Sequence, residues 1–326
     1  MPKTEHSLQL PFLDLSEPFL PSALSSISQA CKDWGFFYIT NHGISKDLYQ
    51  RFHSLSRQVF NLPLDAKLKL GPSSPINTYT PQFIASPFFE TLRVSGPDYH
   101  ASAKKSSDIL FGTPETKFCD LVQEYGSKMM ELSKKIVVVL LKCLGDGLEF
   151  KYLDEFSQCH GYLRINNYTP PEDIEAEDVE GLGMHTDMSC ITILYQDATG
   201  GLQMRSKEGD WVDLLPNEDA LAVNIGDLLQ AWSNGQLRSS KHRVILKQPV
   251  NRLSVAFFWC FEDEKVILAP EDVLGERKQR IYKPFVCLDY IKFRENTEEG
   301  RFDKVGSNIN GFASISASNY DENMPT

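Results

Sequence analysis

The chain has 326 residues, of which 41% are hydrophobic, and a formal net charge of −11 at pH 7. A chain of this size can bury a large core in one or two domains. Its acidic balance disfavours binding to phosphate backbones, so we expect a small-molecule substrate and no nucleic-acid partner. The longest aliphatic run, Ile136 to Leu141, is too short to span a bilayer, and we expect no membrane partner. The composition leaves the oligomeric state open.

The amino terminus and the cysteines bear on the compartment. Residues 1–6 lack the charged and then apolar pattern of a secretory signal. The seven cysteines are scattered without C-x-x-C spacing, and this odd count is typical of reduced thiols that pack in a core. We therefore expect a cytoplasmic protein, an expectation that leaves entry into the nucleus open.

Periodicity and turn residues predict the elements of the N-terminal part. Residues 24–34 suit a helix that leads into a strand over residues 35–40, and residues 45–60 suit a second helix. The segment 71–112 is rich in proline and aromatic residues, which predicts a long irregular loop. A long loop in a compact domain is usually functional, and Phe83 and Phe89 are its candidate substrate contacts.

A long helix is predicted next. Thr113 suits an N-cap before Pro114, and apolar residues recur at helical spacing from there to Gly145. We expect this helix to brace the core from outside.

The rest of the chain has the residue pattern of a β structure. Beyond about Gly161, short β-rich runs alternate with glycine and asparagine turns such as Gly200-Gly201 and Asn234-Gly235. Residues 306–326 are rich in serine and asparagine, and we expect a mobile tail without a catalytic role.

Two motifs in the β-rich half predict a metal site. His185-Thr186-Asp187 offers an imidazole and a carboxylate that point to one face if this segment is a strand. His242 follows later and supplies a second imidazole. Two histidines and one carboxylate without a fourth protein ligand are typical of non-haem Fe(II) sites that keep coordination positions open for substrate and dioxygen. We predict that His185, Asp187 and His242 are the metal ligands and the catalytic centre.

A third motif predicts an organic acid as co-substrate. Arg252 and Ser254 are two positions apart, so both point to the same face of a strand. A guanidinium group offers a planar set of donors that matches a carboxylate, and a neighbouring hydroxyl can add one more hydrogen bond.

In this order and spacing, the motifs resemble those of the 2-oxoglutarate- and Fe(II)-dependent dioxygenases. The resemblance is strongest to the plant group that includes gibberellin oxidases and auxin-oxidising dioxygenases. Other segments that carry it are Trp34 to Gly43, Leu163 to Tyr168, Gly200 to Gln203, Asn224 to Asp227 and Trp232 to Gly235.

The resemblance implies a mainly β fold with flanking α-helices. Its core would be a double-stranded β-helix, or jelly roll, braced by N-terminal helices and one long helix. Residues 1–112 would form an N-terminal helix and strand region that includes the aromatic loop. Residues 113–305 would add the long helix, the jelly-roll core and a closing helix to the same integrated domain, and the tail 306–326 would follow.

The resemblance also implies the cofactors. Fe(II) would be the metal, and 2-oxoglutarate and dioxygen would be co-substrates. The residues implied for 2-oxoglutarate are Arg252, Ser254, Tyr168 and Asn166. In relatives the segment 71–112 helps to enclose the substrate, which favours Phe83 and Phe89 as contacts, and Phe257 and Tyr290 are further candidates.

The implied activity is oxidation, usually hydroxylation, of a small and mostly apolar carboxylic acid, with release of succinate and carbon dioxide. A hormone of the gibberellin type is the first candidate. The alternatives are a dioxygenase of an indole-3-acetate-type auxin or of a specialised metabolite, an Fe(II) oxidase that does not use 2-oxoglutarate, and a catalytically silent small-molecule receptor.

Overall fold

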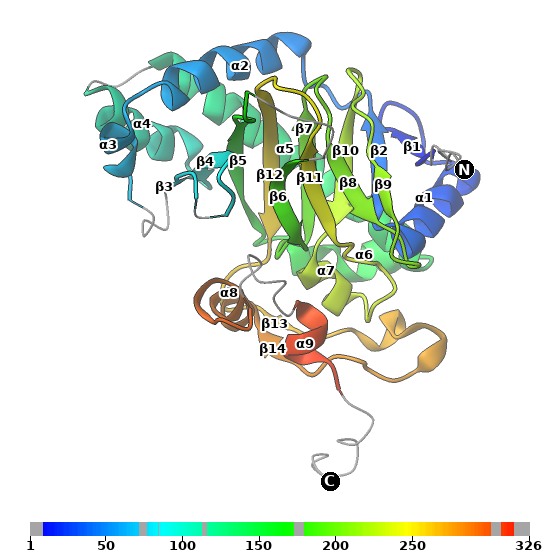
Figure 1. The fold of residues 1–326 in the computed structure, drawn as a ribbon. Coiled ribbons are helices and arrows are strands. Elements are labelled where there is room, and N and C mark those ends of the chain that lie inside the picture. Colours follow the sequence, from blue (N-terminus) through cyan, green and yellow to red (C-terminus); the bar gives the residue numbers. More distant parts are fainter. Residues whose placement is uncertain are drawn as a thin grey trace, which may run out of the picture.

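The fold is a sandwich of two β-sheets flanked by helices (Figure 1). The computed structural model describes residues 9–71, 77–83, 85–112, 116–172, 179–300 and 308–315. The larger sheet has eight strands in the order β1-β2-β10-β7-β12-β5-β4-β3, and the smaller has four in the order β6-β11-β8-β9. Neighbouring strands are antiparallel except for the β1–β2 pair.

The strand bounds follow the β-rich runs of the sequence. The larger sheet consists of β1 (Phe12–Asp14), β2 (Phe36–Thr40), β3 (Asn77–Thr80), β4 (Phe89–Ser95), β5 (His160–Tyr168), β7 (Ile191–Gln196), β10 (Ala220–Ile225) and β12 (Arg252–Cys260). The smaller sheet consists of β6 (Val179–His185), β8 (Leu202–Arg205), β9 (Trp211–Asp213) and β11 (His242–Leu246).

Alternation along the strands divides the buried side chains into two cores. On β12, Val255 and Phe257 point outward into a large apolar core between the sheet and the helices. On the other face, Tyr168 of β5 and Leu202 of β8 belong to a smaller core between the two sheets. Successive strand residues point to opposite faces, so strands of the large sheet contribute side chains to both cores. The inner face is the one that can hold a site.

Helices cover the outer face of the large sheet. They are α1 (Pro21–Asp33), α2 (Lys46–Phe60), α3 (Leu64–Leu68), α4 (Tyr99–Phe111), α5 (Thr116–Leu144), α6 (Leu148–Tyr152) and the 3-10 helix η1 (Leu153–Phe156). The hydroxyl of Ser45 accepts a hydrogen bond from the backbone N–H of Leu48, which caps the start of α2. The buried stripe of α5 packs against β5, β7 and β12, so this helix braces the core.

A C-terminal group of short elements lies below the sandwich in Figure 1. It contains β13 (Val266–Ile267) paired with β14 (Phe285–Val286), the helices α8 (Cys287–Asn296) and α9 (Ile309–Ala313), and the 3-10 helices η2 (Glu271–Val273) and η3 (Gly275–Arg277). The helix α7 (Asp227–Trp232) connects this group to the sandwich and contacts β13 and α9.

Most predicted helices and strands of the N-terminal part are present with shifted bounds. The helix predicted over 24–34 begins earlier, at Pro21, because proline suits the first turn of a helix. The segment 71–112 is not one irregular loop, since it contains β3, β4 and α4. The N-cap predicted at Thr113 lies outside the described residues.

The prediction of a mobile tail over 306–326 is wrong for its first part. Ile309 and Ala313 of α9 are fully buried, because one helical turn brings them onto the same face. Residues 316–326 lie outside the described part of the chain.

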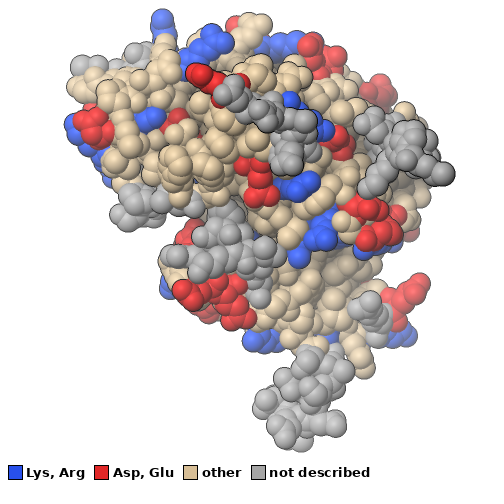
Figure 2. Space-filling model, viewed as in Figure 1, with Lys and Arg blue, Asp and Glu red and all other residues tan. Residues whose placement is uncertain are grey.

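The surface carries mixed charge. On the face drawn in Figure 2, blue Lys and Arg atoms alternate with red Asp and Glu atoms over the described residues, and most of the face is tan. Among the described helices, none has the length and apolar character needed to cross a membrane.

Candidate active site

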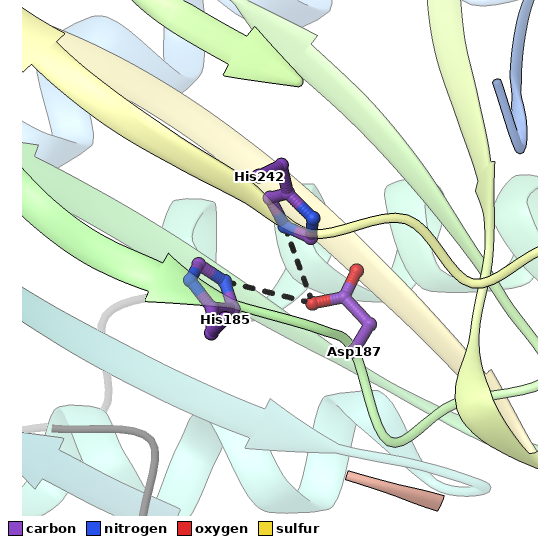
Figure 3. Close-up of side chains that lie close together, drawn as sticks. All are labelled: His185, Asp187 and His242. Atoms are coloured by element: carbon purple, nitrogen blue, oxygen red, sulfur yellow. Dashed lines mark ion pairs between the residues drawn. The ribbon is translucent and has the colours of Figure 1, made fainter. Parts of the chain in front are cut away.

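Three side chains converge between the sheets, as Figure 3 shows. The Nε2 atoms of His185 and His242 lie 3.7 Å and 3.6 Å from Oδ1 of Asp187. The three potential ligand atoms lie within 4.8 Å of one another, and this is the one such cluster found among the described His, Cys, Asp and Glu side chains. We call these three residues the metal group.

Strand pairing brings the metal group together. His185 is the last residue of β6 and His242 is the first of β11, and these two residues face each other across the antiparallel pair. The strand ends at His185 and Asp187 lies in the loop after β6, so the strand condition holds for His185 alone, yet both side chains still reach one point. The loop is held by a hydrogen bond from the N–H of Asp227 to the carbonyl oxygen of Asp187, 2.8 Å long.

Backbone carbonyls orient both imidazoles. Nδ1 of His185 lies 2.7 Å from the carbonyl oxygen of Gly183, and Nδ1 of His242 lies 3.1 Å from that of Ser240. Because a carbonyl oxygen can only accept, each Nδ1 carries the proton and each Nε2 keeps a lone pair that faces Asp187. Burial and the neighbouring His242 lower the pKa of His185, which favours the neutral imidazole. This is the state that a metal ligand requires.

The two oxygen atoms of the Asp187 carboxylate have different neighbours. Its Oδ2 accepts hydrogen bonds from Thr192 Oγ1 at 2.6 Å and Asn224 Nδ2 at 2.8 Å, which leaves Oδ1 toward the imidazoles. Burial raises the pKa of Asp187, but the two histidines and the two hydrogen bonds outweigh it, so the pKa lies below its ordinary value. Two neutral imidazoles and one charged carboxylate are a donor set that fits Fe(II).

A second group lies on the inner face of β5 and β12. Arg252 faces Tyr168 and Ser254 faces Asn166 across the strand pair. We call these four residues the 2-oxoglutarate row. Nη1 of Arg252 donates to Ser254 Oγ at 3.2 Å, Nδ2 of Asn166 donates to the same oxygen at 3.2 Å, and the Arg252 guanidinium lies 4.7 Å from the centre of the Tyr168 ring.

The charge of Arg252 has no acidic partner among the described residues. The side chain is 1% exposed, and its other hydrogen bonds go to the carbonyl oxygen of Gly200 and to Oε1 of Gln196, both neutral. A buried charge is costly unless it is paired, so this guanidinium is suited to bind an incoming carboxylate. Arg252 and the hydroxyl of Ser254 beside it are thus suited to a carboxylate ligand.

The aromatic residues predicted to contact substrate are dispersed. Phe89 lies on the inner face of β4, 5.1 Å from the Tyr168 ring between ring centres, and its substrate role stays a prediction. Phe83 is 79% exposed, outside any enclosed site. Phe257 points into the outer core, because it is an odd number of residues from Arg252. Tyr290 is buried in α8, where its hydroxyl donates to Asp227. The last three positions do not support the predicted contacts.

Several residues of the site belong to no motif with a recognisable chemical role. Thr192 and Gln196 both lie on the inner face of β7, because they are four positions apart in the strand. Asn224 of β10 donates to Asp187. Asp227 is fully buried and pairs with Arg294 at 2.7 Å, a long-range contact that the sequence does not indicate.

Comparisons with known families agree with this geometry. Residues 160–261 match the 2OG-Fe(II) oxygenase superfamily, and residues 10–91 match the N-terminal region described as non-haem dioxygenase in morphine synthesis. The chain is 52% identical to an Arabidopsis thaliana gibberellin 20-oxidase-like protein, over 95% of this chain and 98% of that protein. It is 33% identical to the Arabidopsis thaliana gibberellin 3-beta-dioxygenase 4, over 91% of this chain and 84% of that protein.

Solved structures share the fold. The crystal structure of the rice dioxygenase for auxin oxidation is 27% identical with a TM-score of 0.74, and the comparison covers 88% of this chain and 95% of that one. The crystal structure of JOX2 in complex with 2OG, Fe and JA is 27% identical with a TM-score of 0.75, and covers 89% and 86%. The predicted jelly-roll fold is confirmed. The chain belongs to the 2-oxoglutarate- and Fe(II)-dependent dioxygenase family and is an enzyme that uses both cofactors.

Proposed function

We propose that this enzyme oxidises, by hydroxylation, a small and mostly apolar carboxylic acid of the gibberellin type, with release of succinate and carbon dioxide. The observation that carries the proposal is the 52% identity to a gibberellin 20-oxidase-like protein along nearly the whole of both chains. A gibberellin 3-beta-dioxygenase and gibberellin 20 oxidase 2 are similar at 33% and 32% identity.

The proposed division of labour follows from the two groups of residues. His185, Asp187 and His242 would hold Fe(II), and the 2-oxoglutarate row would bind the distal carboxylate of the co-substrate. Fe(II) held by these residues would supply the oxidative chemistry, with 2-oxoglutarate and dioxygen as co-substrates. Arg252 supplies the charge that the carboxylate needs, and Ser254 adds a hydroxyl beside it.

The chain's own contribution is orientation and exclusion of water. Thr192 and Asn224 fix the rotation of the Asp187 carboxylate, and the carbonyls of Gly183 and Ser240 fix the two imidazoles. His242, Asp187 and Arg252 are all buried, so a bound 2-oxo acid would be shielded from bulk water.

A second candidate substrate is an indole-3-acetate-type auxin. The similarity to the rice dioxygenase for auxin oxidation favours it, although at 27% identity against 52% for the gibberellin-oxidase-like relative. The same fold also accommodates specialised metabolites. An oxidase that does not use 2-oxoglutarate would leave the charge of Arg252 without a function, and a silent receptor would not need the oriented metal group.

The test is anaerobic addition of Fe(II) and 2-oxoglutarate, followed by the weak visible charge-transfer band of their complex. We expect the band to form, and we expect a gibberellin acid to perturb it more strongly than indole-3-acetate does. Turnover in air should then yield one succinate for each oxidised gibberellin. A band that responds to indole-3-acetate alone would replace the gibberellin assignment by the auxin assignment.

Two further expectations belong to this proposal. We propose that the enzyme works in the cytoplasm, and that residues 1–112 and 113–305 act as one integrated domain. Strands from both ranges join the same eight-stranded sheet, which supports the second statement.

A further inference from the structure

Two arginines face each other on the inner side of the large sheet. Arg93 of β4 and Arg164 of β5 are direct partners across the antiparallel pair, in the same register that joins Thr91 to Asn166. Thr91 donates to Oδ1 of Asn166 at 2.7 Å, so this face of β4 and β5 is the one that carries the 2-oxoglutarate row. We call Arg93 and Arg164 the arginine pair.

The register of β12 gives the level of the arginine pair in the sandwich. Inner positions of β12 meet β5 in three successive pairs: Ser254 with Asn166, Ala256 with Arg164, and Phe258 with Tyr162. On its other edge Phe258 pairs with Thr192, whose hydroxyl donates to Asp187. The pair of Ala256 with Arg164 lies between the pair of Ser254 with Asn166, which belongs to the 2-oxoglutarate row, and the pair of Phe258 with Thr192, which adjoins the metal group. The arginine pair is therefore one inner strand position from each.

Neither guanidinium of the arginine pair forms an ion pair with an acid of the described residues. Both side chains are half-buried, and within the described residues no carboxylate oxygen lies within 4.0 Å of either guanidinium. Burial lowers the pKa of Arg164. Tyr162 and Glu295 oppose this shift, while the charge of Arg93 adds to it, and the pKa lies below its ordinary value. Two like charges that face each other in a sheet are unfavourable. An anion between them would relieve both costs.

An aromatic ring holds the arginine pair in position without supplying a counter-charge. The Arg93 guanidinium lies 3.9 Å from the centre of the Tyr162 ring, and Nε of Arg93 donates to Ser95 Oγ at 3.3 Å. Tyr162 in turn stacks on Phe258 at 4.8 Å between ring centres. The ring face attracts the cation but carries no formal negative charge, so it offsets the charge of Arg93 only in part. By contrast, Arg294, which is deeply buried, is neutralised by Asp227.

The arginine pair places two cations close to the metal group and beside the aromatic side chains of Tyr162 and Phe258. Ala256 faces Arg164 across β12 and β5, and its side chain is a single methyl group. We propose that the arginine pair binds the carboxylate of the substrate and so places an apolar carboxylic acid against Tyr162 and Phe258. This inference rests on the proposed function, since it concerns the substrate of the same site.

The experiment uses the full-length protein loaded anaerobically with Fe(II) and 2-oxoglutarate. A gibberellin acid, its methyl ester, indole-3-acetate and the indole-3-acetate methyl ester are each titrated while the charge-transfer band is recorded. The variants are Arg93→Gln, Arg164→Gln and Arg93→Lys. The matched control is Arg243→Gln, since Arg243 lies on β11, stacks on Trp211 at 4.2 Å and donates to Gln203.

We expect each glutamine variant to weaken binding of the responsive acid at least tenfold. Its methyl ester should bind weakly to the parent protein and be changed less than twofold by the same substitutions. Arg93→Lys should recover part of the affinity, and Arg243→Gln should match the parent. The band for 2-oxoglutarate should form in every variant, which separates this subsite from the 2-oxoglutarate row.

Three results would overturn the inference: equal losses for acid and ester, an unchanged acid affinity in both glutamine variants, or an ester that binds the parent protein as tightly as its acid. A parent protein in which no acid perturbs the band would also contradict it. A response to indole-3-acetate alone, lost in the glutamine variants, would overturn the gibberellin assignment and retain the arginine pair as the carboxylate subsite.

Discussion

Arg294 is joined to Thr186 by two hydrogen bonds. Its Nη1 donates to the hydroxyl of Thr186 at 3.1 Å, and its Nη2 donates to the carbonyl oxygen of Thr186 at 3.2 Å. Thr186 is the residue between the two metal-group members of the loop after β6, so the C-terminal helix α8 holds that loop in place. Asp227 completes the arrangement, because its Oδ2 accepts from both Arg294 and Thr186.

Removal of this link should loosen the metal group. We expect Arg294→Met to lower the affinity for Fe(II) about tenfold or more, as loss of a group that orients ligands does. It also leaves Asp227 buried without its partner, which costs about 3–5 kcal/mol of stability. Fe(II) titration and chemical denaturation measure the two effects separately.

A double variant distinguishes the two effects. Arg294→Met combined with Asp227→Leu removes both charges, so it should regain much of the lost stability. Its affinity for Fe(II) should remain low, because the loop is still not held. If the double variant recovered both stability and iron affinity, Arg294 would have only a structural role.

Asn224 should act through the orientation of Asp187. Asn224→Ala removes the donor to Oδ2, and we expect the affinity for Fe(II) to fall by about 10- to 100-fold. Asn217→Ala is the matched control, since Asn217 is exposed in a turn. An iron affinity that is the same in both variants would show that Thr192 alone fixes the carboxylate.

Arg252 should set the affinity for 2-oxoglutarate. We expect Arg252→Met to raise the dissociation constant of 2-oxoglutarate by about 30-fold or more, since loss of one partner of a buried charge pair costs at least about 2 kcal/mol. Arg252→Lys should restore little, because an ammonium group cannot reproduce the planar donors. Fe(II) binding without 2-oxoglutarate serves as the control. Equal losses of iron and 2-oxoglutarate affinity would indicate general disruption of the site.

Each local motif of the site could be predicted from the sequence, because neighbouring positions on a strand, or on two paired strands, bring its side chains together. His185 and His242 end and begin adjacent strands, and Arg252 and Ser254 share a strand face. Their chemistry is specific to metal and carboxylate binding. The link from Arg294 to Thr186 spans 108 residues of sequence, and no periodicity places α8 against that loop.

The sequence does contain signals for the helix α4 and for the orientation of Phe257, both of which were mispredicted. The helix α4 begins at Tyr99, and the carboxylate of the preceding Asp98 accepts a hydrogen bond from the N–H of Ala101, a recognisable N-cap. It was missed because its sequence is rich in serine and alanine and shows no strong apolar stripe. Position parity on β12 also distinguishes Phe257 from the inner residues, as Arg252 and Ser254 are at even spacing from Phe258.

Phe257 and Phe258 are adjacent in β12 and point to opposite faces of the sheet. Phe257 belongs to the outer core and is fully buried, so Phe257→Ala should cost about 3–5 kcal/mol of stability. Phe258 is partly buried on the inner face, where it stacks on Tyr162. Phe258→Ala should therefore cost less stability and raise the KM for the gibberellin acid. Chemical denaturation and steady-state kinetics on both variants check the contrast. If Phe257→Ala changed the KM and Phe258→Ala left it unchanged, the inner face of β12 would not be the face that meets the substrate.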